Sequence, residues 1–346
     1  MRHWLEAGRE ELRDWLRAAG QPAYRADQVF HWLHRRRAAE AGEMANLPAA
    51  LRRRLAGEGV IRGLDELGRR ATADGLTRKL LFAAPDRARL ESVLILEKRG
   101  SRRTLCLSCM SGCPLACRFC ASGRLGFVRD LSAGEILEQA YRLDALARET
   151  GENGASHVVF MGMGEPLLNF GAVLAALDRL IDSEGLGLSG RHATISTIGV
   201  TEGILRLAES GRNCRLALSL HAPERRLRER LLPATRRWPL PGVLAALDAF
   251  ASGRSVTYEY CLVEGINASP RQAEKLARLL AGRRGKVNLI PLNPVPGLSW
   301  RPPPPAEVRE FQAILMAAGI PATVRMEKGA EIGAACGQLR AEAGAD

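Results

Sequence analysis

Short apolar segments alternate with amphipathic helical segments along most of the chain from about residue 104 onward. This alternation predicts βαβ units and a parallel sheet, and about six units predict an incomplete, TIM-like (β/α)6 barrel with functional groups at the carboxyl ends of its strands. Two further strands, 79–82 and 90–95, precede the first unit. The predicted barrel strands are 104–107, 157–161, 193–196, 215–219, 256–261 and 286–290. The predicted helices are 133–148, 170–181, 201–208, 240–250, 270–280 and 305–317.

The first part of the chain has a different pattern. Up to about residue 67, apolar residues recur at helical spacing. The 346 residues are enough for one large and one small domain. We therefore predict a helical N-terminal domain over residues 1–70 and the partial barrel over residues 71–346. The aromatic side chains of the helical domain are expected to form its core: Trp4, Trp15, Tyr24, Phe30 and Trp32.

The charge balance predicts a polyanionic partner such as RNA. The formal net charge is +12 and the pI is near 9.8. Runs of charge are usually solvated surface, but several arginine clusters on a net-basic chain favour nucleic-acid binding. The clusters are Arg35–Arg37, Arg52–Arg54, and Arg225, Arg226, Arg228, Arg230, Arg236 and Arg237.

Several features predict a cytoplasmic protein that does not enter a membrane. The first residues lack the apolar core of a secretory signal, and no apolar run approaches the roughly 18–20 residues of a membrane-spanning helix. Eight cysteines, three of them clustered, fit a reducing compartment better than a disulfide framework.

Three cysteines in one short loop predict a metal centre. Cys113, Cys117 and Cys120 have the spacing CxxxCxxC, one thiolate short of the four that normally hold a 4Fe–4S cluster. The iron left without a thiolate can then bind a substrate. Structural zinc is the alternative, because Cys106 pairs with Cys109 and Cys117 with Cys120 as two CxxC units. Zinc ribbons usually separate such pairs by about 15–20 residues, whereas only residues 110–116 lie between these.

Polar residues gather where the predicted strands end. Glu165 follows one strand in a glycine-rich turn, where its carboxylate could accept hydrogen bonds from an ammonium group. Ser196, Ser219, His221 and Asn293 end or follow other strands. A serine or asparagine here is often a helix cap and a lone histidine is often structural, so the sequence alone leaves both roles open.

A separate cysteine lies near the carboxyl terminus. Cys336 stands among small residues, in Ala-Ala-Cys-Gly-Gln-Leu. Small neighbours would leave its sulfur accessible, which a buried structural cysteine does not need. Composition alone would make it a small apolar residue, as we expect for Cys214 and Cys261.

Taken together, these motifs resemble a known family over essentially the whole chain. The chain is similar to the radical S-adenosylmethionine (SAM) RNA adenine methyltransferases of the RlmN type, whose sister group is the Cfr enzymes. The motifs that carry the resemblance are 24–29 with Trp32, 90–95, the cysteine loop with 121–123, 160–169, 219–223, 288–294 and the Cys336 segment.

The resemblance implies methylation of adenine at carbon 2, with a 4Fe–4S cluster on Cys113, Cys117 and Cys120 and two SAM molecules per turnover. The first SAM methylates Cys336. The second is cleaved to a radical that takes a hydrogen from that methyl group, and the resulting methylene radical adds to the base. Cys106 then releases the product by forming a disulfide with Cys336, and Glu91 is the proton acceptor. Alone, Glu91 would be an ordinary solvent-facing strand residue.

The resemblance also implies the SAM contacts and the partners. The substrates would be an adenosine of 23S rRNA and the tRNA adenosine beside the anticodon. The helical domain would grip RNA, a cytosolic protein such as flavodoxin would donate electrons, and the enzyme would act as a monomer. The SAM contacts would be Gly164, Glu165, Ser196, Ser219, Leu220, His221 and Asn293.

The chain departs from the family pattern at a few positions. Cys109 stands where a serine or another small residue is expected, and Glu327-Lys328 replaces a Ser/Thr-Arg pair, which puts that RNA contact in doubt. Pro166 and Leu167 favour carbon 2 over carbon 8, the position that the Cfr group methylates. Carbon-8 methylation, a different radical reaction on a peptide or metabolite, and a zinc-dependent RNA-binding protein without catalysis stay open as alternatives.

Overall fold

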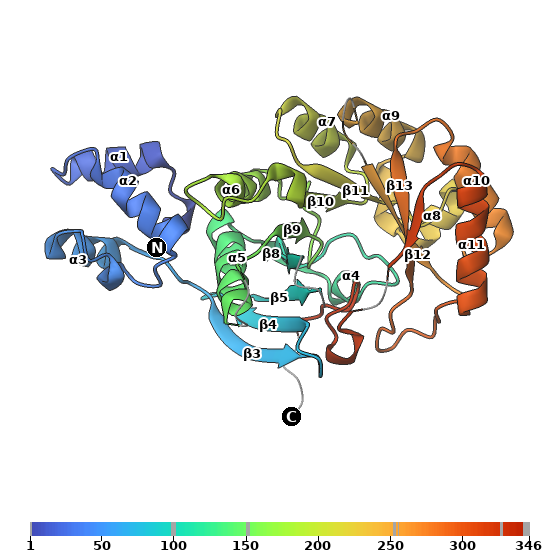
Figure 1. Ribbon diagram of the computed structural model, residues 1–346, viewed down its shortest axis with the longest axis horizontal. Coiled ribbons are helices and arrows are strands. Elements are labelled where there is room, and N and C mark those ends of the chain that lie inside the picture. The colour runs from blue at the N-terminus through green and yellow to red at the C-terminus, as the bar shows by residue number, and fades with distance from the viewer. Residues whose placement is uncertain are drawn as a thin grey trace.

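The computed structural model describes residues 2–97, 102–149, 153–251, 254, 256–325 and 328–341. A helical module at one end of the molecule adjoins an α/β body (Figure 1). The module contains α1 (Arg9–Ala18), α2 (Arg25–Phe30) and α3 (Ala49–Glu58). Two very short strands, β1 (Arg2–His3) and β2 (Gly59–Val60), pair in parallel and bring its two ends together.

Most of the aromatic residues predicted for the core of this module are buried. Trp4, Trp15 and Phe30 are at most 9% exposed, and the indole of Trp4 donates to the Leu55 carbonyl at 2.9 Å. Trp32 is partly buried. Tyr24 is 56% exposed, so its assignment to the core was wrong. Its ring lies at the surface beside the Arg25 guanidinium.

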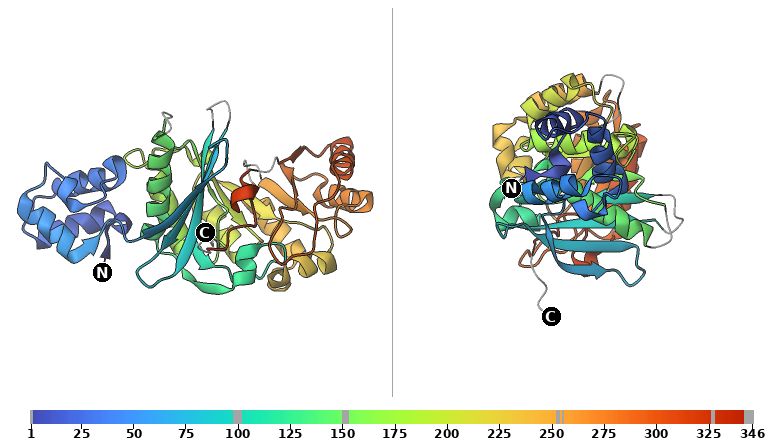
Figure 2. Two further views of the ribbon diagram at one scale, coloured as in Figure 1. Left: turned by 90° about the horizontal axis from the view of Figure 1, so that it is seen from below. Right: turned by 90° about the vertical axis from the view of Figure 1, so that its left-hand side faces the viewer.

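Polar contacts dock the helical module onto the body. Arg9 pairs with Asp182 at 2.8 Å, and Arg37 pairs with the buried Asp144. The fully buried His34 lies 2.8 Å from the Tyr141 hydroxyl. Arg37 was predicted as part of an RNA-binding cluster, but its ion pair joins the two parts of the chain. Figure 2 shows the module and the body from two further directions.

One curved, mixed sheet of ten strands forms the body. In the described residues, seven of its strands run parallel, namely β6, β9, β10, β11, β12, β13 and β14. Strands β3, β4 and β5 extend that sheet as antiparallel strands. The spatial order is β14-β13-β12-β11-β10-β9-β6-β5-β4-β3, with open edges at β3 and β14. The strands are β3 (Asp65–Ala71), β4 (Thr77–Ala83), β5 (Arg89–Leu96), β6 (Arg103–Cys106), β9 (His157–Phe160), β10 (Ala193–Thr197), β11 (Arg215–Ser219), β12 (Val256–Leu262), β13 (Gly285–Pro291) and β14 (Ala322–Val324).

The predicted partial barrel is confirmed, with differences at its edges. All six predicted barrel strands are present, and β14 adds a seventh parallel strand that the sequence did not reveal. Strand β3 was also missed, because the pattern up to about residue 67 was interpreted as helical. It pairs with β4, so the main sheet begins at Asp65. The division into two domains at residue 70 stays a prediction.

Helices connect the parallel strands and cover the outside of the sheet (Figure 1). The predicted helices are all present: α5 (Ala133–Arg148), α6 (Phe170–Ile181), α7 (Thr201–Glu209), α9 (Leu240–Phe250), α10 (Pro270–Leu280) and α11 (Pro305–Ala317). Two short helices, α4 (Ala121–Leu125) and α8 (Arg225–Leu231), follow the cysteine loop and β11. In the ranges given above, no helix combines the length and apolar character that crossing a bilayer requires.

Candidate active site

Two adjoining cavities open at the carboxyl ends of the parallel strands. The first, about 150 Å³, is lined by Cys113, Cys117 and Cys120 and by strand-end residues. The second, about 230 Å³, contains Cys106. Cys336 lines both cavities, and so does Cys120. The sequence-predicted cysteines therefore converge at one place, although Cys106 and Cys336 are 230 residues apart.

The three loop cysteines are positioned by the turn between β7 (Met110–Gly112) and α4. Ala116 adopts a positive φ of 52°, which turns the chain so that the thiols on either side face the first cavity. Burial raises the pKa of Cys113 to about 12 and also raises the pKa of Cys117 and Cys120. At neutral pH these thiols therefore stay protonated until a metal displaces the protons. Three converging thiols beside a cavity fit the open-coordinated 4Fe–4S cluster.

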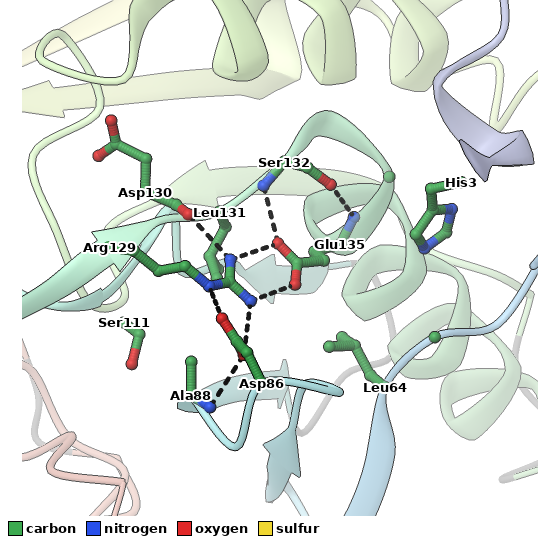
Figure 3. Close-up of polar contacts among 12 residues, drawn as sticks. His3, Leu64, Asp86, Ala88, Ser111, Arg129, Asp130, Leu131, Ser132 and Glu135 are labelled. Atoms are coloured by element: carbon green, nitrogen blue, oxygen red, sulfur yellow. Dashed lines mark hydrogen bonds and ion pairs between the residues drawn. The ribbon is translucent and has the colours of Figure 1, made fainter. Parts of the chain in front are cut away.

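A salt-bridged ribbon supports this loop (Figure 3). Strand β7 pairs with β8 (Phe127–Asp130), and Arg129 on β8 contacts Asp86 and Glu135 with its guanidinium. These hydrogen bonds raise the pKa of Arg129. Glu135 also closes the capping box of α5 with Ser132. The network therefore holds together strands β7 and β8, which flank the cysteine loop in the chain, and the start of helix α5.

Glu165 lies in the first cavity and is 2% exposed. Its carboxylate accepts from the backbone N–H groups of Ile198 at 3.0 Å and Leu167 at 3.2 Å. Burial raises its pKa to about 7, so an ammonium group of a bound ligand would favour its ionised form. Gly164 precedes it with a φ of 106°, and a Cβ there would lie 2.7 Å from Met110.

Most of the other predicted SAM contacts line the same cavity. Ser196, Ser219, His221 and Asn293 all border it, from the ends of β10, β11 and β13. His221 accepts from the Cys261 N–H at 2.8 Å, and burial lowers the pKa of this histidine to about 3, so its ring is neutral. Leu220 is fully buried behind this wall.

Arg228 is a residue whose structural position the sequence did not reveal. It stands in an arginine cluster predicted to contact RNA, yet it is 2% exposed. Its guanidinium donates to the carbonyls of Ile198, which follows β10, of Ser219, which ends β11, and of Leu220, which follows it. The prediction of RNA contact is therefore wrong for Arg228, which instead fixes two strand ends beside the first cavity. The other residues of that cluster are exposed or partly exposed.

The segment with Cys336 lies between the cysteine loop and the sheet. The Gly337 carbonyl of this segment accepts a hydrogen bond from the Ala121 N–H at 2.7 Å. The side-chain amide of Asn293 donates to the Cys336 carbonyl at 2.9 Å. Cys336 is partly exposed, as expected from its small neighbours. The eight cysteines all lie in the described part of the chain, and no disulfide joins any of them.

Glu91 lies outside the two cavities. It is 1% exposed, so the expectation of a solvent-facing residue was wrong. Its carboxylate pairs with Lys79 at 2.8 Å and accepts from the Arg340 N–H at 2.9 Å. Lys79 could not be singled out from the sequence, because a lysine in an apolar strand normally faces water.

The two departures from the family pattern also take defined places. Cys109 is 2% exposed, and its thiol donates to the Met163 carbonyl at 3.6 Å. Lys328 lines the second cavity together with Arg325. Glu327 lies outside the described residues.

Comparisons with known proteins define the class first. The model of the radical SAM superfamily matches residues 107–279, and the model of the ribosomal RNA large subunit methyltransferase N-terminal domain matches residues 4–61. The structure is similar to that of a radical SAM methyltransferase from Sphaerobacter thermophilus, with a TM-score of 0.95 and 42% identity, covering 99% of this chain and 100% of that chain. The protein is thus a radical SAM enzyme with a 4Fe–4S cluster and SAM as cofactors.

Curated relatives narrow the class to a family. The chain is 46% identical to a probable dual-specificity RNA methyltransferase RlmN of Parafrankia sp., covering 99% of this chain and 92% of the relative. The corresponding protein of Moorella thermoacetica is 45% identical, with 96% and 95% covered. The chain belongs to the RlmN family of radical SAM RNA methyltransferases. This membership excludes a zinc protein without catalysis.

Proposed function

We propose that the protein methylates carbon 2 of adenosine in 23S rRNA and of the tRNA adenosine beside the anticodon, through an S-methylcysteine at Cys336. The observation that carries the proposal is the place of Cys336, in the wall shared by the cysteine-loop cavity and the Cys106 cavity. The relatives' description as dual-specificity RNA methyltransferases supports two RNA substrates. The match of residues 4–61 to the ribosomal RNA methyltransferase N-terminal domain supports rRNA.

The first cavity would hold SAM. Glu165 would accept hydrogen bonds from its ammonium group, with Gly164 allowing close approach of the backbone, and Ser196, Ser219, His221 and Asn293 would border the rest. The cluster, when bound to Cys113, Cys117 and Cys120, supplies one electron for cleavage of the sulfonium. Leu220 would contribute through its backbone, because its side chain is fully buried.

The second cavity would receive the adenine, beside Cys106, Arg325 and Lys328. Cys336 would accept a methyl group from one SAM, and that methyl would give a hydrogen atom to the radical formed from the second SAM and bond to the ring carbon. The adduct would then give up one electron and the ring proton. The Cys106 thiolate would attack the Cys336 sulfur, so that a disulfide forms and the carbon–sulfur bond breaks, and the carbon would take a proton to become the product methyl group. Glu91 stays the proposed acceptor of the ring proton. Reduction of the disulfide in each turnover fits a cytoplasmic enzyme. A cytosolic donor such as flavodoxin would supply the electron to the cluster.

The test measures modified nucleosides by mass spectrometry in the rRNA and tRNA of a deletion strain, with and without the gene restored. We expect 2-methyladenosine to return in both pools. Restored 8-methyladenosine would move the enzyme to the Cfr type, and no change in either pool would refute RNA adenine methylation.

The role of Cys336 is tested in the same strain. We expect Cys336→Ala to abolish the modification while iron and acid-labile sulfide stay at wild-type levels. Cys214→Ala is the matched control, because Cys214 is a buried thiol that lines neither cavity. A fully active Cys336→Ala variant would contradict the covalent route.

A further inference from the structure

The segment that carries Cys336 is held on two opposite sides. Towards the cysteine loop, the Ser122 hydroxyl donates to the Leu339 carbonyl at 2.5 Å, next to the bond between Ala121 and Gly337. Towards the antiparallel strands, the segment meets one buried ion pair, formed by Lys79 of β4 and Glu91 of β5. Figure 1 shows this last part of the chain, in dark red, beside α4 and β4.

Each partner of the ion pair forms a hydrogen bond with the backbone of the segment, one before and one after Cys336. The Lys79 ammonium donates to the Gly333 carbonyl at 3.2 Å. The Glu91 carboxylate accepts from the Arg340 N–H at 2.9 Å. Gly333 has a φ of 65°, and a Cβ there would lie 3.4 Å from the Lys79 nitrogen, so the glycine lets the ammonium approach the backbone. The pair thus closes the arc 333–340 from both ends.

The register of the strands places the pair on the face that receives the segment. Lys79 is opposite Val93 and Glu91 is opposite Leu81, so Lys79 and Glu91 are diagonal neighbours on one face of the sheet. A small apolar cluster lies on the same face, and it unites the segment with the strands. Its buried members are Val93, Cys106, Val159, Met163, Ala334 and Leu339.

Glu91 also reaches the other catalytic cysteine through its backbone. The Ser108 hydroxyl, two residues after Cys106, donates to the Glu91 carbonyl at 2.5 Å. Glu91 therefore fixes the Cys106 loop by its main chain and the Cys336 segment by its side chain. The Lys79 ammonium lies 2.8 Å from this carboxylate and helps to hold it where it accepts from the Arg340 N–H.

We propose that Lys79 is a positioning residue that sets the place of Cys336 relative to Cys106, acting through Glu91 and the Gly333 carbonyl. This role rests on the proposed function of Cys336 as methyl acceptor. The Lys79 side chain is 9% exposed and lines neither cavity, so it would contact neither the adenine nor SAM. Its effect on the methylation of Cys336 would therefore act through the order of the arc 333–340.

The test compares Lys79→Met with Lys79→Arg, which keeps a cation and donors. In Lys79→Met we expect the amide of Arg340 to exchange its hydrogen at least about tenfold faster, the factor that about 1.4 kcal/mol represents. The fraction of Cys336 carrying a methyl group, measured by mass spectrometry of the purified protein, should fall by a similar factor. Iron content and cleavage of SAM should stay near the wild-type values, and Lys79→Arg should recover most of the methylation.

Two further variants separate positioning from general stability. Lys275→Met removes a lysine from the partly exposed pair with Glu224, 2.6 Å apart and remote in the chain from residues 333–340, and should change neither readout. If Lys79→Met does not fold, the double variant Lys79→Met/Glu91→Leu replaces the pair by apolar side chains, which is often neutral for stability. It should fold, and its Cys336 should still carry less methyl group than in the wild type, which is the readout for this variant because Glu91→Leu itself removes the acceptor of the Arg340 N–H.

Unchanged exchange at Arg340 in the folded variants would overturn the proposal, as would wild-type methylation of Cys336. Failure of the proposed function is recognised separately. It would leave Cys336 without a methyl group in the wild-type protein, whereas the exchange measurement at Arg340 would still report on the Lys79 contact.

Discussion

Replacing Arg228 by methionine should loosen the strand ends that carry the predicted SAM contacts. The guanidinium is 2% exposed and donates to the carbonyls of Ile198, Ser219 and Leu220. A hydrogen bond from a charged donor contributes about 1.5–3 kcal/mol, so the three together are worth about 4.5 kcal/mol at the lower limit.

Desolvation of the guanidinium offsets most of that gain. Burial lowers the pKa of Arg228 from 12.5 to about 10. At about 1.36 kcal/mol per pH unit, burial disfavours the charged form by about 3 kcal/mol. We therefore expect Arg228→Met to lower the free energy of unfolding by only about 1–2 kcal/mol. The affinity for SAM should fall at least about tenfold, because the carbonyls of Ile198, Ser219 and Leu220 lose their donor.

Urea unfolding under anaerobic conditions and equilibrium dialysis with SAM measure the two effects. Arg226→Met is the matched control, since Arg226 is on the same helix and exposed. We expect this control to behave like the wild type in both assays. SAM affinity within about twofold of wild type in Arg228→Met would refute the positioning argument, since twofold is only about 0.4 kcal/mol. A loss of stability above about 4 kcal/mol would show that the desolvation cost is overestimated.

Two other predictions follow from the cysteines and from a buried histidine. Cys106→Ala should leave RNA covalently attached to Cys336, seen as a slow-migrating band on denaturing gels that Cys214→Ala does not produce; free, unmodified RNA would contradict the resolving role of Cys106. Burial lowers the pKa of His34 from 6.5 to about 3, so between these pH values the unfolded chain binds a proton that the folded chain does not. The free energy of unfolding should therefore fall as the pH drops below 6.5, with about 2 kcal/mol lost through His34 at pH 5, and urea titrations of His34→Gln should show a shallower pH dependence than the wild type.

The sequence predicted the regular part of the fold because each barrel strand buries a short apolar run between two helices. It missed β3 because Asp65–Ala71 is almost entirely exposed and carries charged residues on both faces. It missed β14 because three residues are too few for a periodic signal. Both edge strands form because they pair with a neighbouring strand, and this pairing cannot be recognised from the residues of the edge strand alone.

Within the site, the residues with a recognisable motif could be named from the sequence, whereas the residues that support them could not. The cysteine loop, Glu165 and Cys336 converge on two cavities, as their motifs implied. Lys79 and Arg228 look like surface cations in the sequence. Each is buried by segments that are far away in the chain: Lys79 contacts Gly333, and Arg228 contacts Ile198. Only the tertiary fold provides the carbonyls that make such burial tolerable.

The same burial bears on the resolving role proposed for Cys106. Burial raises the pKa of Cys106 to about 12, with the nearby Arg325 acting in the opposite direction. The thiolate is the species that attacks sulfur, so at neutral pH Cys106 is nearly inert towards Cys336. The proposed attack therefore needs a cation near Cys106 that lowers the pKa of its thiol, as Arg325 does. It also needs a leaving group on the Cys336 sulfur, and a free thiol has none. Under the proposed mechanism, the disulfide therefore forms only after Cys336 is bonded to the RNA base through its methylene carbon, when the carbon–sulfur bond can break.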